Sequence, residues 1–345
     1  MLFQIVGLYT ILHFLVDFAC AVLLYHQTYP FLQTPADIIY AFLLYNFFAF
    51  AVQLPIGIIA DSINKNALFA ITGCFCVILA YLCIPLGITA CIIAGIGNAS
   101  FHIGAGIDVL NLSNRKATLS GIFVSSGALG IFLGTQPPIY ATIMPILLMI
   151  LLSIGGYLIY RLYQKYHTKL SNIITHNTLS TTQILMIICL CGAVLLRSYI
   201  SFVLAFEWKS PFMIGLIFTS GIILGKALGG ILSDTFGFKT TALLSLTLSA
   251  ICFCGAFQNT YWGIIAGTLG VLLFNMTMPI TLTALSNFIP AQKGMAFGLL
   301  TLMLFFGALP TLLGFHFPYF NPLGLCSLVA LSAIILYGGL LNQKR

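Results

Sequence analysis

Few ionisable side chains stand inside the long apolar runs of this sequence, and those few could do chemistry. His13 and Asp17 lie four residues apart in the first run, so on a helix they share one face and can touch. His102 follows Asn98 at the same spacing in a later run. A charge at the centre of a membrane helix costs about 2.5–3.5 kcal/mol on insertion scales, so such residues are functional candidates by default. We predict that Asp17 carries a proton, with His13 tuning its environment and His102 as a further proton-coupling group.

Two cations, Arg197 and Lys226, also stand inside apolar runs. Counting the rise along a helix places Asp17 and Arg197 in the outer half of a membrane, where they could pair. Protonation of Asp17 would then release Arg197, or the pair could be a static tie; the sequence leaves both open. Lys226 lies nearer the cytoplasm, where it could attract an anionic substrate or extend to the interface. Together with Asn98 and Asn275, these two cations are our candidate substrate-binding residues.

A metal site built from His13, Asp17 and His102 is not predicted, because no close ligand spacing supports one. The same count along the helices places His102 on the cytoplasmic side of the membrane centre and Asp17 on the outer side. Acid–base catalysis needs groups within hydrogen-bond reach, so groups at different depths disfavour an intramembrane enzyme. No cofactor is expected, and the absence of a Walker-type phosphate loop disfavours ATP as the energy source.

The composition explains why polar residues are so few. Hydrophobic residues make up 60% of the 345 residues and charged residues only 6%. A soluble domain carries about 25% charged residues, so this chain belongs in a lipid bilayer. At roughly 20 residues per span, the apolar runs fit about twelve helices with short loops. No alternating pattern of a membrane barrel is visible. We therefore predict an all-α polytopic membrane protein.

The expected spans have boundaries that follow the apolar runs. They are 4–25, 36–58, 67–84, 88–110, 117–137, 141–161, 181–206, 211–233, 240–257, 262–288, 294–314 and 320–341. Pro55, Pro279 and Pro310 fall inside spans and should kink them, because proline removes a backbone donor and clashes with the preceding turn.

The longest polar connection covers residues 162–180, where a linker between two bundles belongs. We predict two pseudo-symmetric six-helix bundles, residues 1–161 and 181–345, joined by this cytoplasmic linker. Internal duplication of this kind is common in secondary transporters. A monomer is sufficient for such an architecture.

Basic residues orient the expected helices. Those in alternate loops and at the C-terminus are Lys65, Arg115, Lys116, Arg161, Lys165, Lys169, Lys239, Lys293, Lys344 and Arg345. The opposite loops hold only Lys209, so both termini should be cytoplasmic, in a plasma membrane. The net charge of +7 then reflects topology. No basic stretch interleaved with aromatic residues supports nucleic-acid binding.

A short polar signature occurs twice, each time at the end of an apolar run. Gly57 pairs with Gly230, and Asp61 with Asp234, at one constant offset of half the chain length. The residues of the two copies that we single out are Gly57, Asp61, Lys65, Gly230, Asp234, Gly237 and Lys239.

These signatures, on a frame of about twelve spans, resemble the major facilitator superfamily over essentially the whole chain. The loop between the second and third spans of that family reads glycine, three residues, aspartate, a basic residue, one residue, glycine, then basic residues. In the first copy Asn64 replaces the second glycine. Asparagine is among the few residues that enter left-handed backbone conformations, so the replacement is physically reasonable.

The resemblance implies an alternating-access transporter in which the two aspartates latch the outward-facing state. Acidic groups are favoured at the positive N-terminus of a helix. Asp61 is therefore expected to meet the start of the span near Gly294, and Asp234 the start of the span near Ala117.

A narrower resemblance concerns the polar residues inside the spans. His13 and Asp17 early in the chain, and the run Gly97-Asn98-Ala99-Ser100-Phe101-His102, look like the branch of fosmidomycin-resistance-type exporters. This resemblance implies an efflux pump.

The leading interpretation is a proton-coupled secondary transporter of a small organic solute. Asp108 falls at the cytoplasmic edge of its span, so among the interior charges Arg197 and Lys226 outnumber Asp17, which favours an anionic or zwitterionic substrate. The alternatives are a non-transporting membrane sensor or scaffold and, with less support, an intramembrane enzyme.

Overall fold

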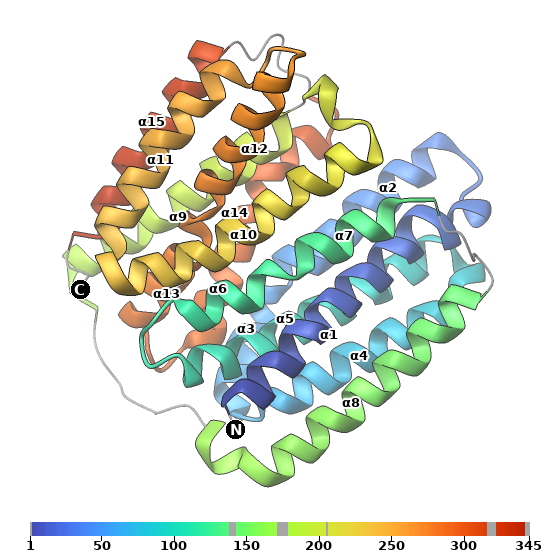
Figure 1. The fold of residues 1–345 in the computed structure, drawn as a ribbon. Helices are drawn as coiled ribbons and strands as arrows, with labels where there is room; N and C mark the ends of the chain where they lie inside the picture. The colour runs from blue at the N-terminus through green and yellow to red at the C-terminus, as the bar shows by residue number, and fades with distance from the viewer. Residues whose placement is uncertain (1, 138–142, 171–178, 205, 316–321, 342–345) are drawn as a thin grey trace. The chain divides into compact units, whose positions relative to one another are not determined.

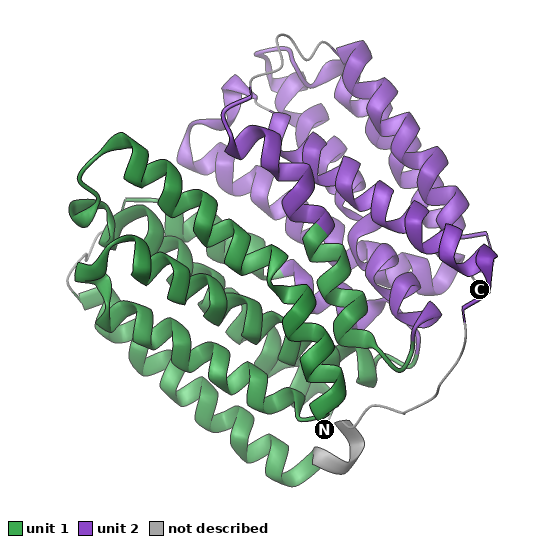
Figure 2. Cartoon of the chain, turned by 180° about the vertical axis from the view of Figure 1, so that it is seen from behind, with its two compact units in different colours: residues 1–114, 126–175, 290–302 green, residues 115–125, 176–289, 303–345 purple. Residues whose placement is uncertain are grey.

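The computed structural model describes residues 2–137, 143–170, 179–204, 206–315 and 322–341. Every regular element in these ranges is helical and none is a strand (Figure 1). The chain forms two compact units (Figure 2). Unit 1 comprises Met1–Asn114, Ser126–Thr175 and Pro290–Leu302, and unit 2 comprises Arg115–Ser125, His176–Ile289 and Met303–Arg345.

Unit 1 contains most of the helices from the first half of the sequence. Its α-helices are α1 (Leu2–Val22), α2 (Pro35–Asn46), α3 (Gln53–Ile63), α4 (Asn66–Leu82), α5 (Ile88–Leu112), α7 (Gly127–Thr135), α8 (Ile143–Leu170) and the beginning of α14 (Lys293–Leu312). Short π- or 3₁₀-helical stretches lie at Leu23–Gln27, Tyr29–Phe31, Phe47–Ala51 and Ile84–Leu86.

Unit 2 contains most of the helices from the second half. They are α6 (Thr118–Ser125), α9 (Thr181–Val203), α10 (Phe212–Phe236), α11 (Phe238–Gly255), α12 (Tyr261–Asn275), α13 (Thr277–Phe288), the remainder of α14 and α15 (Pro322–Gly339). A 3₁₀ turn lies at Glu207–Lys209.

The helices confirm an all-α polytopic membrane protein. Within the described residues, 11 helical segments are long and apolar enough to cross a bilayer. The shorter apolar helix α4, with 17 residues, occupies the one expected span that these segments leave over, residues 67–84. Within the described residues, every expected span therefore corresponds to one helix or to consecutive helical segments. The division into bundles 1–161 and 181–345 stays a prediction.

Two of the three prolines inside spans coincide with breaks in the helices. The ring of a proline clashes with the carbonyl four residues earlier. Four residues before Pro55, the π-helical stretch ends at Ala51, and four residues before Pro279, α12 ends at Asn275. The helices are thus interrupted close to Pro55 and Pro279, where kinks are predicted. Pro310 instead lies inside α14, two residues before that helix ends.

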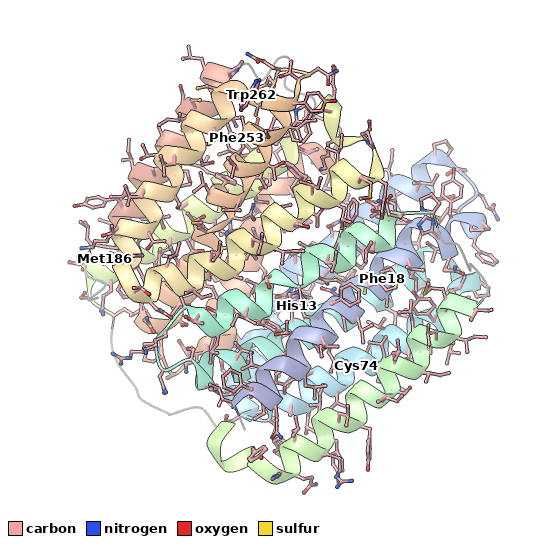
Figure 3. The ribbon with its side chains drawn as sticks, in the orientation of Figure 1. His13, Phe18, Cys74, Met186, Phe253 and Trp262 are labelled. Atoms are coloured by element: carbon pink, nitrogen blue, oxygen red, sulfur yellow. The ribbon has the colours of Figure 1, made fainter. Side chains whose placement is uncertain are left out.

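An aromatic cluster forms the core of unit 2 at one end of its helices. The Trp208 ring stacks on Phe206, with ring centroids 4.8 Å apart, and its Nε1 donates a 2.8 Å hydrogen bond to the carbonyl of Ala256. Phe253, labelled in Figure 3, packs edge-on against Phe274. Lys209 lies in the loop beside this cluster, and burial lowers the pKa of its ammonium group below the usual value.

Candidate functional site

The polar residues of unit 1 gather where α1 passes α5. The two helices run antiparallel, because Tyr9 contacts Asp108 whereas the later Asp17 contacts the earlier Asn98. Four-residue spacing places Tyr9, His13 and Asp17 on one face of α1. His13 is labelled on α1 in Figure 3. This face of α1 supplies a buried polar stripe in an otherwise apolar helix.

Asp17 is the centre of a cluster of polar side chains. Its Oδ2 lies 3.2 Å from Nε2 of His13, and its Oδ1 lies 3.7 Å from Nε2 of His102. The Oδ1 atom also accepts a 2.8 Å hydrogen bond from Nδ2 of Asn98. His13 is 5% exposed and Asp17 is 7% exposed. Two imidazoles and an amide therefore surround the carboxylate of Asp17 in place of water.

A backbone carbonyl fixes the orientation of the His102 ring. Its Nδ1 donates a 2.8 Å hydrogen bond to the carbonyl oxygen of Asn98, one turn earlier on α5. A carbonyl oxygen only accepts, so Nδ1 carries the hydrogen and Nε2 is left to face Asp17. The rings of His13 and His102 are perpendicular, with centroids 4.5 Å apart.

Gly127 of α7 closes the cluster on a third side. A Cβ atom at Gly127 would collide with Oδ2 of Asp17 and with Nε2 of His13. Three residues further along α7, a Cβ at Gly130 would collide with the backbone of α1. Only glycine lets α7 lie this close to the polar face of α1.

The structure corrects our expectation that His13, Asp17 and His102 lie at different depths. One ligand-type atom from each side chain lies within 4.8 Å of those of the other two. A joint site of the three side chains is therefore geometrically possible. The physical cause of this difference from the expectation is that side chains lean toward the N-terminus of their helix. On antiparallel helices Asp17 and His102 thus lean toward each other.

A second buried network lies on the same two helices and was missed by the sequence analysis. Asp108 is 0% exposed and accepts hydrogen bonds from the Tyr9 hydroxyl at 2.7 Å and from Nδ2 of Asn66 at 2.9 Å. It thereby ties α5 to α1 and α4. The sequence signal that could have revealed this network is an aspartate inside a long apolar helix.

The remaining candidate substrate residues belong to unit 2. Arg197 of α9 is 7% exposed, and its Nη1 has no hydrogen-bond partner within the described part of the chain. Lys226 of α10 is half-buried. Nδ2 of Asn275 donates a 2.9 Å hydrogen bond to Val271 of its own helix. Because Asp17 belongs to the other unit, its pairing with Arg197 stays a prediction.

The two repeated aspartates lie where the resemblance implied. Asp61 of α3 accepts 2.8 Å hydrogen bonds from the backbone amides of Gly294 and Met295, in the first turn of α14. These amides have no partner within their own helix, so the carboxylate caps α14 from a distant part of the sequence.

Asp234 of α10 caps α6 in the same way within unit 2. Its Oδ1 accepts a 2.8 Å hydrogen bond from the amide of Ala117, and its Oδ2 a 2.9 Å bond from the amide of Thr118. The Thr118 hydroxyl adds a bond of 2.5 Å to Oδ2. The predicted contacts of both aspartates are thus confirmed, and their role in transport stays a proposal.

Glycines bring the capped helices into backbone contact. A Cβ at Gly57 would collide with Gly294, and a Cβ at Gly230 would lie 2.5 Å from the carbonyl oxygen of Ala117. Gly57 and Gly230 are equivalent positions of the two sequence copies, so these two contacts are equivalent as well.

The residue after each aspartate helix turns the chain with a positive φ. Asn64 has a φ of 55° and Gly237 a φ of 90°. The left-handed conformation inferred for Asn64 is therefore confirmed. Lys239 donates a 2.6 Å hydrogen bond to the carbonyl of Leu341, whereas Lys65 is exposed.

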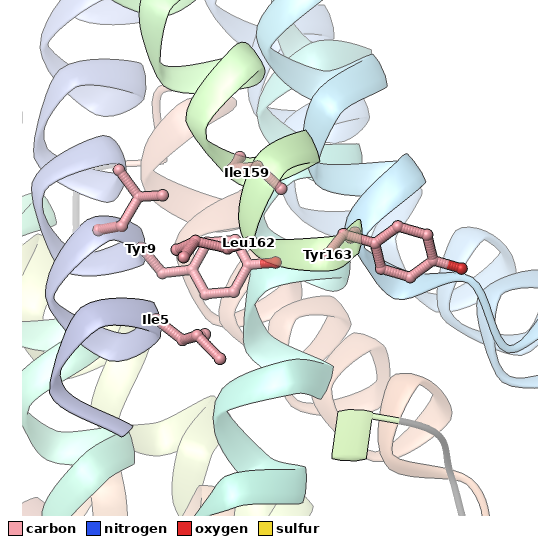
Figure 4. A pocket seen from close by; sticks show the side chains of 7 residues that line it. Ile5, Tyr9, Ile159, Leu162 and Tyr163 are labelled. Carbon is pink, nitrogen blue, oxygen red and sulfur yellow. The ribbon is translucent and has the colours of Figure 1, made fainter. Parts of the chain in front are cut away.

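A small cleft in unit 1 lies apart from the candidate residues. Figure 4 shows side chains that line it, among them Ile5, Tyr9, Ile159 and Leu162. Its walls come from α1, α4 and α8 and contain none of the candidate proton or substrate residues. We assign it no function.

Comparisons with known proteins identify the fold. No protein-family model matches the sequence, and no curated protein sequence matches it. Solved structures do match over nearly the whole chain. The transporter FucP, a major facilitator superfamily member from E. coli solved in the outward conformation, has 13% identity, covers 99% of each chain and gives a TM-score of 0.67.

Two further transporters show the same architecture. A bacterial homologue of the iron transporter ferroportin, in an outward-facing state, has 12% identity, a TM-score of 0.70 and coverage of 96% of this chain and 98% of its own. The human organic anion transporter MFSD10 has 12% identity, a TM-score of 0.66 and coverage of 97% and 99%. The protein therefore has the fold of major facilitator superfamily transporters. The narrower resemblance to fosmidomycin-resistance-type exporters stays a prediction.

Proposed function

We propose that this protein is a proton-coupled secondary transporter of a small organic solute that works by alternating access. The observation that carries the proposal is the cluster of buried His13 and Asp17 with half-buried His102 in a membrane protein with a transporter fold. Imidazole gains and loses a proton near neutral pH, and a buried carboxylate is costly unless it is paired. The cluster therefore has the chemistry of a proton-binding site.

Asp17 is the coupling group in this proposal. When protonated, it loses its attraction for protonated imidazoles and becomes a hydrogen-bond donor. When ionised, it attracts the protonated rings of His13 and His102 at the contacts described above. Proton binding thus changes the contacts between α1 and α5, and such a change can bias the protein between two states.

The proposed substrate is an anionic or zwitterionic organic solute. Support comes from Arg197, a buried guanidinium with an unpartnered Nη1 within the described residues, and from Lys226. Asn98 and Asn275 are proposed to add polar contacts. FucP is described as a fucose:proton symporter and MFSD10 as an organic anion transporter, so this fold carries both kinds of activity. We propose efflux on the resemblance of His13, Asp17 and His102 to exporters.

The two capped helices are the proposed latch. Asp61 and Asp234 each hold the first turn of a helix from the opposite half of the sequence. Breaking both caps would free those helices when the protein changes state. We further propose a plasma-membrane location with both termini in the cytoplasm, on the distribution of lysine and arginine.

Proton flux in proteoliposomes tests this proposal. Vesicles with a trapped pH dye are challenged with a panel of organic anions, phosphonates, sugars and lipophilic cations. We expect a compound-dependent pH change that is lost in Asp17→Asn. Asp37→Asn is the matched control, because Asp37 is a carboxylate of the same unit that caps α2.

The same assay separates the alternatives. A sensor or scaffold gives no flux of any solute. An intramembrane enzyme gives product without net movement across the membrane. The convergence of His13, Asp17 and His102 makes that second control necessary, since it supplies the proximity that acid–base catalysis needs.

A further inference from the structure

We propose that His13, Asp17 and His102 bind a divalent first-row transition metal ion such as Zn²⁺. This inference goes beyond proton coupling, and it does not depend on solute transport because metal binding is measured directly. It begins from three side chains of metal-ligand type that lie together, with His13 and Asp17 buried and His102 half-buried. The packing of α1 against α5 brings these three side chains together inside unit 1.

The distances fit a metal ion. Zinc binds imidazole nitrogen at about 2.0–2.1 Å and carboxylate oxygen at about 2.0–2.2 Å, so neighbouring ligand atoms in a tetrahedral site lie about 3.3 Å apart. The distance from Nε2 of His13 to Oδ2 of Asp17 is 3.2 Å, and that from Nε2 of His102 to Oδ1 is 3.7 Å. One ligand atom from each side chain lies within 4.8 Å of the other two, and atoms farther apart than about 3.3 Å must move closer for all three to bind one ion.

The hydrogen bonding of His102 supports the assignment independently. Its Nδ1 donates to the carbonyl of Asn98, so in the neutral ring Nε2 presents a lone pair. That lone pair faces Oδ1 of Asp17, which is also electron-rich. Two such atoms repel unless a cation lies between them, and the cation is either a proton or a metal ion. Metal-binding histidines characteristically donate their other nitrogen to a carbonyl or carboxylate.

The surroundings of Asp17 resemble the outer shell of a metal site. Asn98 donates to Oδ1 and holds the carboxylate in place. Gly127 leaves no side chain over Oδ2 and over Nε2 of His13. Three protein ligands leave a fourth position open, as in zinc sites that bind water or a substrate.

The ligand types select the class of metal. Two imidazoles and one carboxylate suit Zn²⁺, Fe²⁺, Co²⁺ and similar ions. Ca²⁺ and Mg²⁺ prefer oxygen ligands, which are the minority here. Protons compete with the metal for the same lone pairs, so binding should release protons and weaken as the pH falls.

Visible absorption of Co²⁺ tests the proposal on the full-length protein in detergent. We expect a d–d spectrum that saturates at one Co²⁺ per chain and disappears when Zn²⁺ is added. His13→Gln, Asp17→Asn and His102→Gln should each weaken Co²⁺ binding by more than about 100-fold, since even outer partners contribute about 10- to 100-fold. Asn98→Ala should weaken it by about 10-fold. The control variant Asp37→Asn should bind normally.

X-ray absorption of the Zn²⁺-loaded wild-type protein keeps the test independent of the folding of any variant. Nitrogen and oxygen ligands with imidazole scattering are expected, whereas sulfur ligands would place the metal at the cysteines and overturn the proposal. Absence of saturable Co²⁺ binding would overturn it too. Proton flux that continues in the presence of a chelator, together with absent metal binding, would reject the metal site and leave the proposed transport intact.

Discussion

The backbone amide of Gly294 donates a 2.8 Å hydrogen bond to Oδ1 of Asp61, a residue 233 positions earlier in the chain. The carboxylate thus caps the first turn of α14 from a distant part of the sequence. Asp234 does the same for α6 at Ala117. Each copy of the repeated signature therefore ends a helix and also stabilises the beginning of a distant one.

Asp61→Asn should weaken this cap. Replacing the carboxylate removes its charge from the positive end of α14 and one of two acceptor atoms, at a cost of about 1 kcal/mol. A cost of that size shifts a two-state equilibrium by about fivefold. We expect slower transport and altered labelling of single cysteines placed along α14. An unchanged labelling rate in Asp61→Asn would contradict the latch.

Thr118→Val should destabilise the protein through the second cap. The Thr118 hydroxyl donates a 2.5 Å hydrogen bond to Asp234, and hydrogen bonds to charged groups contribute about 1.5–3 kcal/mol. We expect a lower thermal midpoint in detergent. Thr235→Val is the matched control, because the Thr235 hydroxyl bonds only to its own helix at Ile231. Equal midpoints for the two variants would show that the hydroxyl adds nothing to the cap.

Asn64→Ala should cost about 1–2 kcal/mol of stability, whereas Asn64→Gly should be nearly neutral. The residue has a φ of 55°, which glycine adopts freely and alanine does not. Gly237→Ala should behave like Asn64→Ala, because its φ is 90°. Thermal midpoints of the three variants measure this ranking. A midpoint for Asn64→Ala above that of Asn64→Gly would refute the backbone explanation.

Asp108→Leu should be more harmful than Asp108→Asn. Leucine leaves the Tyr9 hydroxyl and the Asn66 amide without their acceptor, and each buried unsatisfied group costs about 1–3 kcal/mol. Asparagine keeps one acceptor atom. Yield and thermal midpoint in detergent measure the difference. Equal losses for the two variants would show that the carboxylate's charge, rather than its acceptor atoms, holds this network together.

Parts of this structure were predictable because the repeated signature resembles that of the major facilitator superfamily. Asp61 and Asp234 occupy equivalent positions in the two copies of the signature. The resemblance implied that each aspartate meets the beginning of a distant helix, and both contacts are present. The turn at Asn64 was predictable because few residue types adopt a positive φ.

The joint site of Asp17 and His102 was not predictable from depth alone. Counting residues along a helix fixes the height of a Cα atom only if the helix is upright and its end is known. It also ignores the direction in which the side chain leans. The two errors add when the helices are antiparallel. They led us to place Asp17 and His102 at different depths, although Oδ1 of Asp17 and Nε2 of His102 lie 3.7 Å apart. Gly127 gave no signal, since its role depends entirely on what it packs against.

The most direct test of proton coupling compares two transport modes of Asp17→Asn in proteoliposomes. One mode is exchange of labelled for unlabelled solute without a gradient, and the other is accumulation driven by a pH gradient. If Asp17 carries the coupling proton, exchange persists while accumulation falls to the level of protein-free vesicles, and Asp37→Asn behaves like the wild type. Accumulation driven by the pH gradient at the wild-type rate in Asp17→Asn would contradict the account.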